Sequence, residues 1–484
     1  MKVRAVTPNW SLSRGSLPTD TIHPPRSFPL EWAYLRRDID RTDLNVVFTV
    51  NDEYIKNRSI ADFVRAEADA PADVYVVSTA PSYLFWRCAP TSLELVSRYV
   101  SGIRRGAPSA RTVLVGPHAT AEPSSTLKWT GADLALRGEI DPHLAPMLAS
   151  LQAGEVPTAL AAPGRPGIVQ PEMPLVDRAA SYGSGDLTGA KPHVWLPDVE
   201  QKIARLGGTY ALAETARGCS FDCGYCFRAG FRRSLRLKPL AAVSEELRTL
   251  RDLGVSYVFM IDETFGVPRS HYRGVLAVLR ELDLAFGLQT RPDVWAPDSI
   301  HELADSGCVY VELGTESLTV AGVTALSKYR DPAKVMRSTQ QFREILPNVG
   351  VNIVDVGNPD LGLLPRALAR RERDNEGERP PAFIPYMGTI WGEKALARER
   401  LPSTWRSVDR LHAVYSLAAR NGPASWLLRE SLLVRRITGA VLHIVGRGLP
   451  RMSWRSRHDR RYGPMSVSPP RKNAVNSRSE TGDG

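Results

Sequence analysis

Short apolar runs alternate with helical patterns along residues 1–150. The runs are KVRAV, NVVFTV, DVYVVST, TVLVG and ADLALRG, and the segment PLEWAYLRRDI between the first two has helical spacing. Strands that alternate with helices are typical of a mainly parallel α/β sheet. Ligands of such sheets bind beyond the carboxyl ends of the strands. The candidate binding loops are therefore those after Val6, Ser78, Val115 and Leu136.

A second alternating region follows a segment of different composition. Residues 151–205 are rich in Pro, Gly, Ala and Asp and lack sustained periodicity, which predicts a linker or a segment that wraps between domains. Residues 206–392 contain strand-like runs separated by helical patterns, at 209–214, 255–261, 285–290, 308–314, 351–357 and 382–386. Six such units predict a partial (β/α)6 barrel of the TIM type, with its chemistry at the carboxyl ends of the strands; an open sheet is the alternative.

The C-terminal part divides into a small helical region, 393–449, and a basic tail, 450–484, for which we expect disorder. One helical face of the first part carries Trp426, Leu433, Ile437, Val441 and Ile444. This face predicts a helix that packs on the barrel, with a helix lying on a membrane surface as the alternative.

Composition and charge narrow the function classes. The chain has 484 residues, 43% hydrophobic and 24% charged, which is ordinary globular composition. The net charge of +10 lies in the C-terminal part, since the stretch from Glu393 onward carries 18 Lys and Arg against 7 Asp and Glu and the preceding part is nearly neutral. We therefore expect no nucleic-acid partner for the folded domains. No apolar stretch reaches the length of a membrane span and no signal sequence is evident, so we expect a cytoplasmic protein.

Three of the five cysteines lie in one short segment, ETARGCSFDCGYCFRAGFRRS. Cys219, Cys223 and Cys226 have the spacing Cys-x-x-x-Cys-x-x-Cys, directly after the first predicted strand of the barrel. Zinc usually takes four ligands, and no second cysteine pair stands nearby. An iron–sulfur cube held by three cysteines leaves one iron open for another ligand. We interpret Cys308, which opens a strand, and Cys88 as core residues.

This segment resembles the signature of the radical S-adenosylmethionine (SAM) superfamily, including the aromatic Tyr225 before the last cysteine. The resemblance covers about 206–392 and implies that the three cysteines bind a 4Fe-4S cluster. It further implies that SAM binds the open iron, and that an electron from a donor such as flavodoxin or ferredoxin cleaves SAM to an adenosyl radical. The SAM-binding residues that the resemblance implies, on loops after successive strands, are Tyr225, Asp262, Glu263, Thr264, Arg291, Gly314, Glu316, Ser317 and Gly357.

Two of these positions have other interpretations. The run from Asp262 to Thr264 also has the composition of a helix N-cap with acidic residues in the first turn. Asn358 follows Gly357 where the family more often has Leu, which weakens the resemblance at that turn.

The N-terminal segments VLVGPHATAEP and ADLALRGEID resemble the Rossmann-like (flavodoxin-like) cobalamin-binding domains that precede many radical SAM barrels. DPHLAP departs from the Asp-x-His-x-x-Gly motif, so the cobalt would have no histidine below it. An unliganded domain for substrate binding or docking is the alternative. The cobalamin-binding residues that the resemblance implies are Thr79, Ser82, Tyr83, Trp86, Arg87, Gly116, Pro117, His118, Gly138 and Glu139.

Together these resemblances predict a cobalamin-dependent radical SAM methyltransferase. It would methylate an unactivated carbon, less commonly phosphorus, of a small or carrier-bound substrate, in natural-product biosynthesis. One alternative keeps both cofactors for a cyclisation, ring contraction or rearrangement without methylation. Others are an RNA-associated factor that uses the basic tail, and a degenerate barrel that serves as a binding module.

Overall fold

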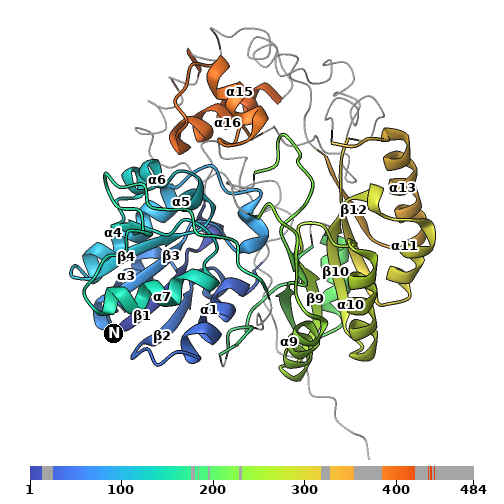
Figure 1. Cartoon of the computed structure of the whole chain (residues 1–484), viewed down its shortest axis with the longest axis horizontal. Helices are drawn as coiled ribbons and strands as arrows, with labels where there is room; N and C mark the ends of the chain where they lie inside the picture. Colours follow the sequence, from blue (N-terminus) through green and yellow to red (C-terminus); the bar gives the residue numbers. More distant parts are fainter. Residues whose placement is uncertain are drawn as a thin grey trace, which may run out of the picture. The chain divides into compact units, whose positions relative to one another are not determined.

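Two parallel sheets organise the chain in the computed structural model (Figure 1). The structure describes residues 1–13, 26–175, 180–183, 185–194, 197–227, 232–317, 328–353, 384–419, 434, 437, 438 and 441. These residues belong to the first of two compact units, Met1–Arg447, and the second is Gly448–Gly484. The predicted tail, Gly357 and most of the predicted helix from Trp426 to Ile444 lie outside the described residues.

The N-terminal sheet has five parallel strands in the order β2-β1-β3-β4-β5, which is a flavodoxin-like order. Its strands are β1 (Lys2–Thr7), β2 (Val47–Asp52), β3 (Val74–Ser78), β4 (Arg111–Val115) and β5 (Leu134–Ala135). The strand order changes direction between β1 and β3, so the loops after β1 and β3 frame the crevice where ligands of such sheets bind. The α/β prediction for this region is confirmed.

Helices cover both faces of this sheet, as right-handed crossovers require. They are α1 (Leu30–Asp40), α2 (Glu53–Lys56), α3 (Ile60–Asp69), α4 (Glu94–Gly106), α5 (Pro117–Ala121), α6 (Pro123–Thr130) and α7 (Asp141–Gln152). Helix α4 packs against α3 and α6, whereas α1 packs against α7. The short 3-10 helices η1 (Trp10–Leu12) and η2 (Tyr83–Trp86) follow β1 and β3 at the carboxyl edge.

The second sheet also has five parallel strands, in the order β12-β11-β10-β9-β6. They are β6 (Thr209–Ala213), β9 (Val255–Met260), β10 (Ala285–Thr290), β11 (Cys308–Glu316) and β12 (Val349–Ile353). The helices between them are α9 (Leu240–Asp252), α10 (Arg269–Glu281), α11 (Pro297–Ala304) and α13 (Pro332–Ile345), with η3 (Pro292–Val294) after β10. This sequential order is that of a partial β/α barrel. Of the sixth predicted strand, 384–386 is not a strand and 382–383 lies outside the described residues.

A small antiparallel pair interrupts the barrel pattern after β6. Strand β7 (Ala216–Arg217) pairs with β8 (Arg236–Leu237). The pair closes the base of the loop that carries the three clustered cysteines, so these two strands fix where that loop begins and ends.

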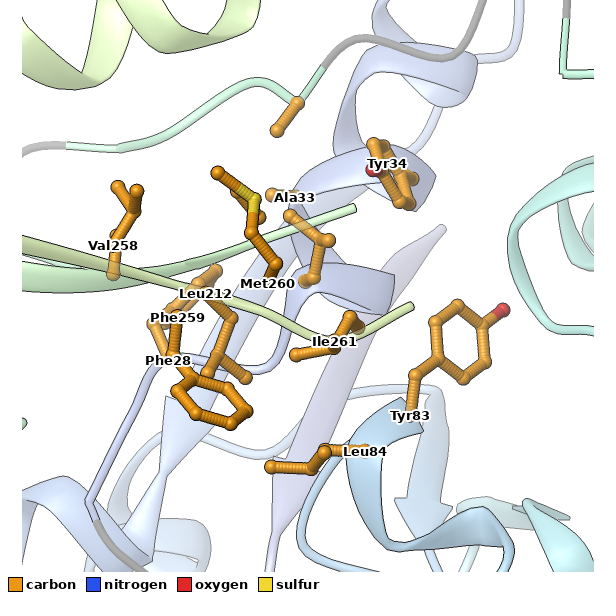
Figure 2. Close-up of a cluster of buried hydrophobic side chains, with 14 of the residues drawn as sticks. Phe28, Ala33, Tyr34, Tyr83, Leu84, Leu212, Val258, Phe259, Met260 and Ile261 are labelled. Carbon is orange, nitrogen blue, oxygen red and sulfur yellow. The ribbon is translucent and has the colours of Figure 1, made fainter. Parts of the chain in front are cut away.

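The largest core cluster contains residues from both sheets and from the segment between them. Figure 2 shows part of it, where Ala33 of α1 and Leu84 of η2 lie among side chains of β6 and β9 such as Leu212 and Met260. The predicted linker contains α8 (Pro197–Ala204). Helices α15 (Ile390–Arg398) and α16 (Trp405–Ala419) follow the barrel. In the part of the chain that the structure describes, no helix is long and apolar enough to cross a membrane.

Candidate functional site

The cysteine loop lies between β7 and β8, and its three thiols are partly buried. The backbone turns tightly inside it, where the Cys226 N–H donates to the Cys223 carbonyl oxygen at 3.0 Å. Among the described residues, no three His, Cys, Asp or Glu side chains are grouped closely enough to hold one metal ion. A single zinc ion requires such a group. A cube cluster binds each cysteine through a different iron, so its ligands surround the cluster instead of meeting at one point.

The carboxyl ends of β9 and β10 supply residues that contact two of the thiols. Thr264, beyond β9, places its Oγ1 3.5 Å from the Cys219 Sγ. Arg291, directly after β10, places its Nη1 3.6 Å from the Cys223 Sγ. Asp293 holds the same guanidinium through contacts of 3.0 and 2.9 Å, and the Phe221 ring centre lies 3.7 Å from it. These contacts fix a cation beside the cysteine loop.

Lys328 adds a second cation that the sequence analysis did not find, since no motif surrounds it. Its buried Nζ donates to the Gly314 carbonyl oxygen and to the Glu316 carboxylate, both at 2.8 Å. Both acceptors were predicted SAM-binding residues at the end of β11. The Tyr225 ring centre lies 5.9 Å from the same Nζ, so the structure brings Tyr225, Gly314 and Glu316 together around Lys328. Ser317, the next residue along, is buried.

Helix α15 contacts the cysteine loop from the C-terminal side. The Trp391 N–H donates to the Gly224 carbonyl oxygen at 3.1 Å, and the Trp391 ring lies 5.3 Å from that of Tyr225. A β-carbon on Gly224 would lie 3.2 Å from the Trp391 indole nitrogen, so a side chain at this position would crowd the tryptophan. The sequence analysis did not single out Trp391 either.

Burial and nearby cations have opposite effects on the pKa values of the thiols. Burial raises the pKa of Cys226 to about 12, and the Arg87 guanidinium opposes part of that rise. Burial also raises the pKa of Cys223, against Lys328 and Arg291. Iron binds the thiolate, so cations beside the loop favour the form that ligates the metal. The three cysteines therefore fit an iron–sulfur cluster.

Asp262 and Glu263 bind the chain around the cysteine loop. Asp262 accepts from the Thr215 N–H at 2.7 Å and from its hydroxyl at 2.5 Å, and burial raises the pKa of Asp262 to about 7. Glu263 accepts from the Gly218 N–H at 2.8 Å and from the Arg232 Nη1 at 2.7 Å. These two carboxylates therefore bind residues at both ends of the cysteine loop. Their contact with SAM stays a prediction.

The loop after β3 joins the N-terminal domain to the cysteine loop. The Arg232 guanidinium lies 4.2 Å from the Tyr83 ring centre and 5.3 Å from that of Trp86. Arg87 reaches the barrel directly, since its Nη1 donates to the Glu263 carbonyl oxygen at 2.8 Å. The predicted cobalamin loop is thus packed against the barrel strand ends.

The two cysteines outside the cluster differ in exposure. Cys308 is buried, as predicted. Cys88 is exposed, which corrects its interpretation as a core residue. Desolvation by the surrounding residues nevertheless raises the pKa of its thiol to about 11, and Arg87 opposes part of that rise. The physical reason for the difference is that Cys88 ends the packed η2 loop, whereas Cys308 begins a central strand.

The ends of β3 and β4 lie close together at the crevice of the N-terminal sheet. The Thr79 N–H donates to the Val115 carbonyl oxygen at 2.9 Å, and its buried Oγ1 has no hydrogen-bond partner among the described residues. Gly116 has a φ of +119°, and a β-carbon there would lie 2.5 Å from the Thr79 hydroxyl. Only glycine fits this turn. Pro117 begins α5 directly after it, and Ser82 is buried before η2.

His118 is fully buried on the same edge. Its Nε2 lies 2.6 Å from the Pro90 carbonyl oxygen, and its ring centre lies 4.2 Å from that of Trp405 on α16. Burial lowers the pKa of His118 to about 4. The imidazole is therefore neutral near pH 7, and its side chain is enclosed by Pro90 and Trp405.

This pKa gives a pH prediction. The pKa of His118 falls from 6.5 to about 4 on folding, so the unfolded chain binds more protons between these values and stability decreases as the pH falls through that window. Through this histidine, the wild type should lose about 2 kcal/mol of its free energy of unfolding between pH 7 and pH 5. We expect His118→Gln to lack that loss. Urea unfolding of both proteins at the two pH values measures the difference. Equal pH dependence would contradict a buried neutral histidine.

Comparisons with known proteins identify the barrel. Residues 214–359 match the Radical SAM superfamily. The chain is 26% identical over 216 residues to the ribosomal protein uS12 methylthiotransferase RimO of Heliobacterium modesticaldum, covering 39% of this chain and 46% of the relative. It is 24% identical over 254 residues to the anaerobic magnesium-protoporphyrin IX monomethyl ester cyclase of Rubrivivax gelatinosus, covering 49% and 44%. The chain thus spans about half the length of these curated relatives.

Solved structures extend the similarity of fold to the N-terminal domain. The radical SAM methyltransferase TsrM of Kitasatospora setae superposes with a TM-score of 0.54 at 16% identity, covering 73% of this chain and 67% of TsrM. The cobalamin-dependent radical SAM enzyme OxsB superposes with a TM-score of 0.54 at 13% identity, covering 91% and 72%. The chain therefore contains a radical SAM domain, and its overall fold is like that of these cobalamin-dependent enzymes. A radical SAM domain implies a 4Fe-4S cluster and SAM.

Proposed function

We propose that the protein is a cobalamin-dependent radical SAM methyltransferase. Its substrate is a small or carrier-bound molecule in natural-product biosynthesis. The atom that it methylates is an unactivated carbon, less commonly phosphorus. The observation that carries this proposal is the contact between the loop after β3 and the barrel strand ends, where Arg87 binds the Glu263 carbonyl oxygen. A substrate carbon must be reached from both domains in such a reaction, and this contact keeps them together.

The residues around the cysteine loop have distinct roles in this proposal. When bound, the cluster and SAM supply an adenosyl radical and cobalamin supplies the methyl group. Cys219, Cys223 and Cys226 hold the cluster. Arg291 lies beside the Cys223 thiol, with Asp293 on its other side, so its guanidinium is oriented before any ligand binds. Two further groups of predicted SAM contacts, Thr264 beyond β9 and the end of β11, lie at the same carboxyl edge of the barrel sheet.

The N-terminal domain also fits cobalamin. The buried Thr79 hydroxyl has no partner among the described residues, and it lies at the crevice that the strand order predicts. Gly116 lets the backbone come close to it. Cys88, two residues after η2 in the loop after β3, is exposed to solvent. In this proposal Thr79, Ser82, Arg87 and the backbone at Gly116 hold the cofactor.

The partners follow from the chemistry. The barrel requires a one-electron donor such as flavodoxin or ferredoxin, and the substrate enters as a small molecule or on a carrier. We place the protein in the cytoplasm, where the cluster thiols stay reduced. We assign no nucleic-acid partner to the folded domains.

A second candidate function is ring closure without methyl transfer. The similarity to the magnesium-protoporphyrin IX monomethyl ester cyclase of Rubrivivax gelatinosus favours it. The two reactions use the same cofactors in this proposal and differ in the mass of their products.

Labelled SAM separates the two reactions. The reconstituted protein, hydroxocobalamin, a reductant and SAM with a deuterated methyl group are incubated with candidate substrates, so that SAM is the source of the methyl group. We expect S-adenosylhomocysteine, 5′-deoxyadenosine and a product that carries the labelled methyl group. A product that has lost two hydrogens and carries no label would instead establish the cyclase reaction.

A further inference from the structure

Glu139 lies on the loop after β5, in the run RGEID, and is held firmly by its own domain. The preceding Gly138 has a φ of +122°, and its N–H donates to the Thr120 hydroxyl at 3.1 Å. The Ile140 N–H donates to the Tyr83 hydroxyl at 2.9 Å. The Glu139 side chain is only 2% exposed. Its carboxylate therefore has a fixed position at the edge of the N-terminal domain.

Three arginines from the hairpin around the cysteine loop bind this carboxylate. Arg236 of β8 binds it with two prongs, Nη2 to Oε1 at 2.5 Å and Nη1 to Oε2 at 2.9 Å. Arg217 of β7 places its Nη1 3.1 Å from Oε2, and the Arg232 Nε lies 3.4 Å from Oε1. Burial alone would raise the pKa of Glu139, but these three guanidinium groups hold it below its usual range. Glu139 is thus a buried anion that pairs with three cations.

The same arginines determine where the first cysteine stands. Arg217 lies two residues before Cys219, and the Cys219 N–H donates to the Arg232 carbonyl oxygen at 3.3 Å. A β-carbon on Gly218, between them, would lie 2.0 Å from the Ser234 carbonyl oxygen, so the two sides of the loop touch there. A shift of the hairpin would therefore move Cys219.

The arginines depend on Glu139 to different degrees. Arg217 also binds Asp141 and Glu214. Arg232 also binds Glu263 at 2.7 Å. Among the described residues, the other carboxylate near Arg236 is that of Glu172, which is 3.6 Å away and 19% exposed. Loss of the Glu139 charge would consequently affect β8 and the C-terminal side of the loop most.

We propose that Glu139 is a positioning residue for the cluster loop and not a cobalamin contact. The N-terminal domain then sets the geometry of the cluster through this ion-pair network, in addition to any cofactor that it binds itself. This inference rests on the proposed function only in that the three cysteines hold an iron–sulfur cluster.

The experiment compares Glu139→Gln with Glu67→Gln in the full chain after anaerobic reconstitution with iron, sulfide and cobalamin. Glu67 is a matched control because it is equally buried in the N-terminal domain, where it accepts from Arg4, Asn51 at 2.8 Å and Tyr75 at 2.6 Å. None of these partners belongs to the barrel. Arg236→Lys is the second variant, since lysine keeps the charge and loses the two-pronged geometry.

The readouts are the rate of iron release to a chelator, the EPR spectrum of the reduced cluster with SAM, and the cobalamin content. We expect Glu139→Gln to release iron at least fivefold faster than wild type, with an altered EPR spectrum. Arg236→Lys should release iron at a rate between those of wild type and Glu139→Gln. Glu67→Gln should release iron at the wild-type rate. Cobalamin content should be the same in all four proteins. If Glu139→Gln fails to fold, Arg236→Lys carries the comparison.

Several results would overturn the proposal. These are a wild-type rate of iron release in Glu139→Gln, equal acceleration in Glu67→Gln, or loss of cobalamin from Glu139→Gln with an unchanged cluster. None of these readouts requires methyl transfer. A wild-type protein that transfers no methyl group, with iron release in the variants as expected above, would argue against the proposed function alone. A wild-type protein that binds no iron would overturn both.

Discussion

Each of the three single variants Cys219→Ala, Cys223→Ala and Cys226→Ala should lose the iron–sulfur cluster and should no longer cleave SAM. The cluster has three protein thiolates, so the loss of one leaves a second iron without a protein ligand. Iron content and the visible absorption of the reconstituted proteins measure the effect. Thr264 and Arg291, which lie beside two of the thiols, cannot replace a thiolate as a ligand.

The matched control is Cys308→Ala. Cys308 is buried at the start of β11 and its thiol contacts the Tyr310 carbonyl oxygen, away from the cysteine loop. We expect this variant to bind iron as the wild type does. Full iron content in any of the three loop variants would contradict the assignment of the cluster ligands.

Replacement of Arg217 by methionine should lower the free energy of unfolding by about 3–5 kcal/mol, because it removes the buried cation that three buried carboxylates share. The Arg217 side chain is fully buried and binds Glu139 at 3.1 Å, Asp141 at 3.0 Å and Glu214 at 2.6 Å. Methionine has a similar length, so the effect of the charge dominates that of the volume. Urea unfolding followed by circular dichroism measures the loss.

Arg65→Met provides the control for this change. Arg65 pairs with Asp62 on the surface of α3, where the two side chains are 74% and 46% exposed. Exposed pairs of this kind contribute about 0–1 kcal/mol, so we expect little change. A loss in Arg217→Met as small as that in Arg65→Met would show that the carboxylates around Arg217 are stable without it.

The pattern of the sequence predicted both sheets because most of their strands are short, apolar and largely buried; the edge strand β2, where only Asp52 is buried, is an exception. Strand β3 shows this directly, since all five of its residues are buried. The cysteine spacing predicted the loop because its ligands are close together in the chain. Thr264 and Arg291 were predicted from the resemblance as SAM-binding residues, because each follows a strand that was visible in the pattern; that they lie beside Cys219 and Cys223 comes from the structure.

The rest of the site depends on contacts between distant residues. Glu139 and Arg236 are 97 positions apart, and neither the run RGEID nor the hairpin pattern indicates that they meet. Lys328 shows the same limit, because its burial follows from the fold of β11 and not from its neighbours. Cys88 was misinterpreted for a related reason, since a small apolar residue in an aromatic run predicts burial that the end of η2 does not provide.

Iron and cobalt content per chain, measured after anaerobic purification, cluster reconstitution and incubation with cobalamin, tests the central claim most directly. We expect about four irons, as one cube cluster requires, together with one cobalt. Four irons without retained cobalt would keep the radical SAM barrel and contradict the cobalamin-dependent methyltransferase, leaving the N-terminal domain as a module for substrate or partner binding.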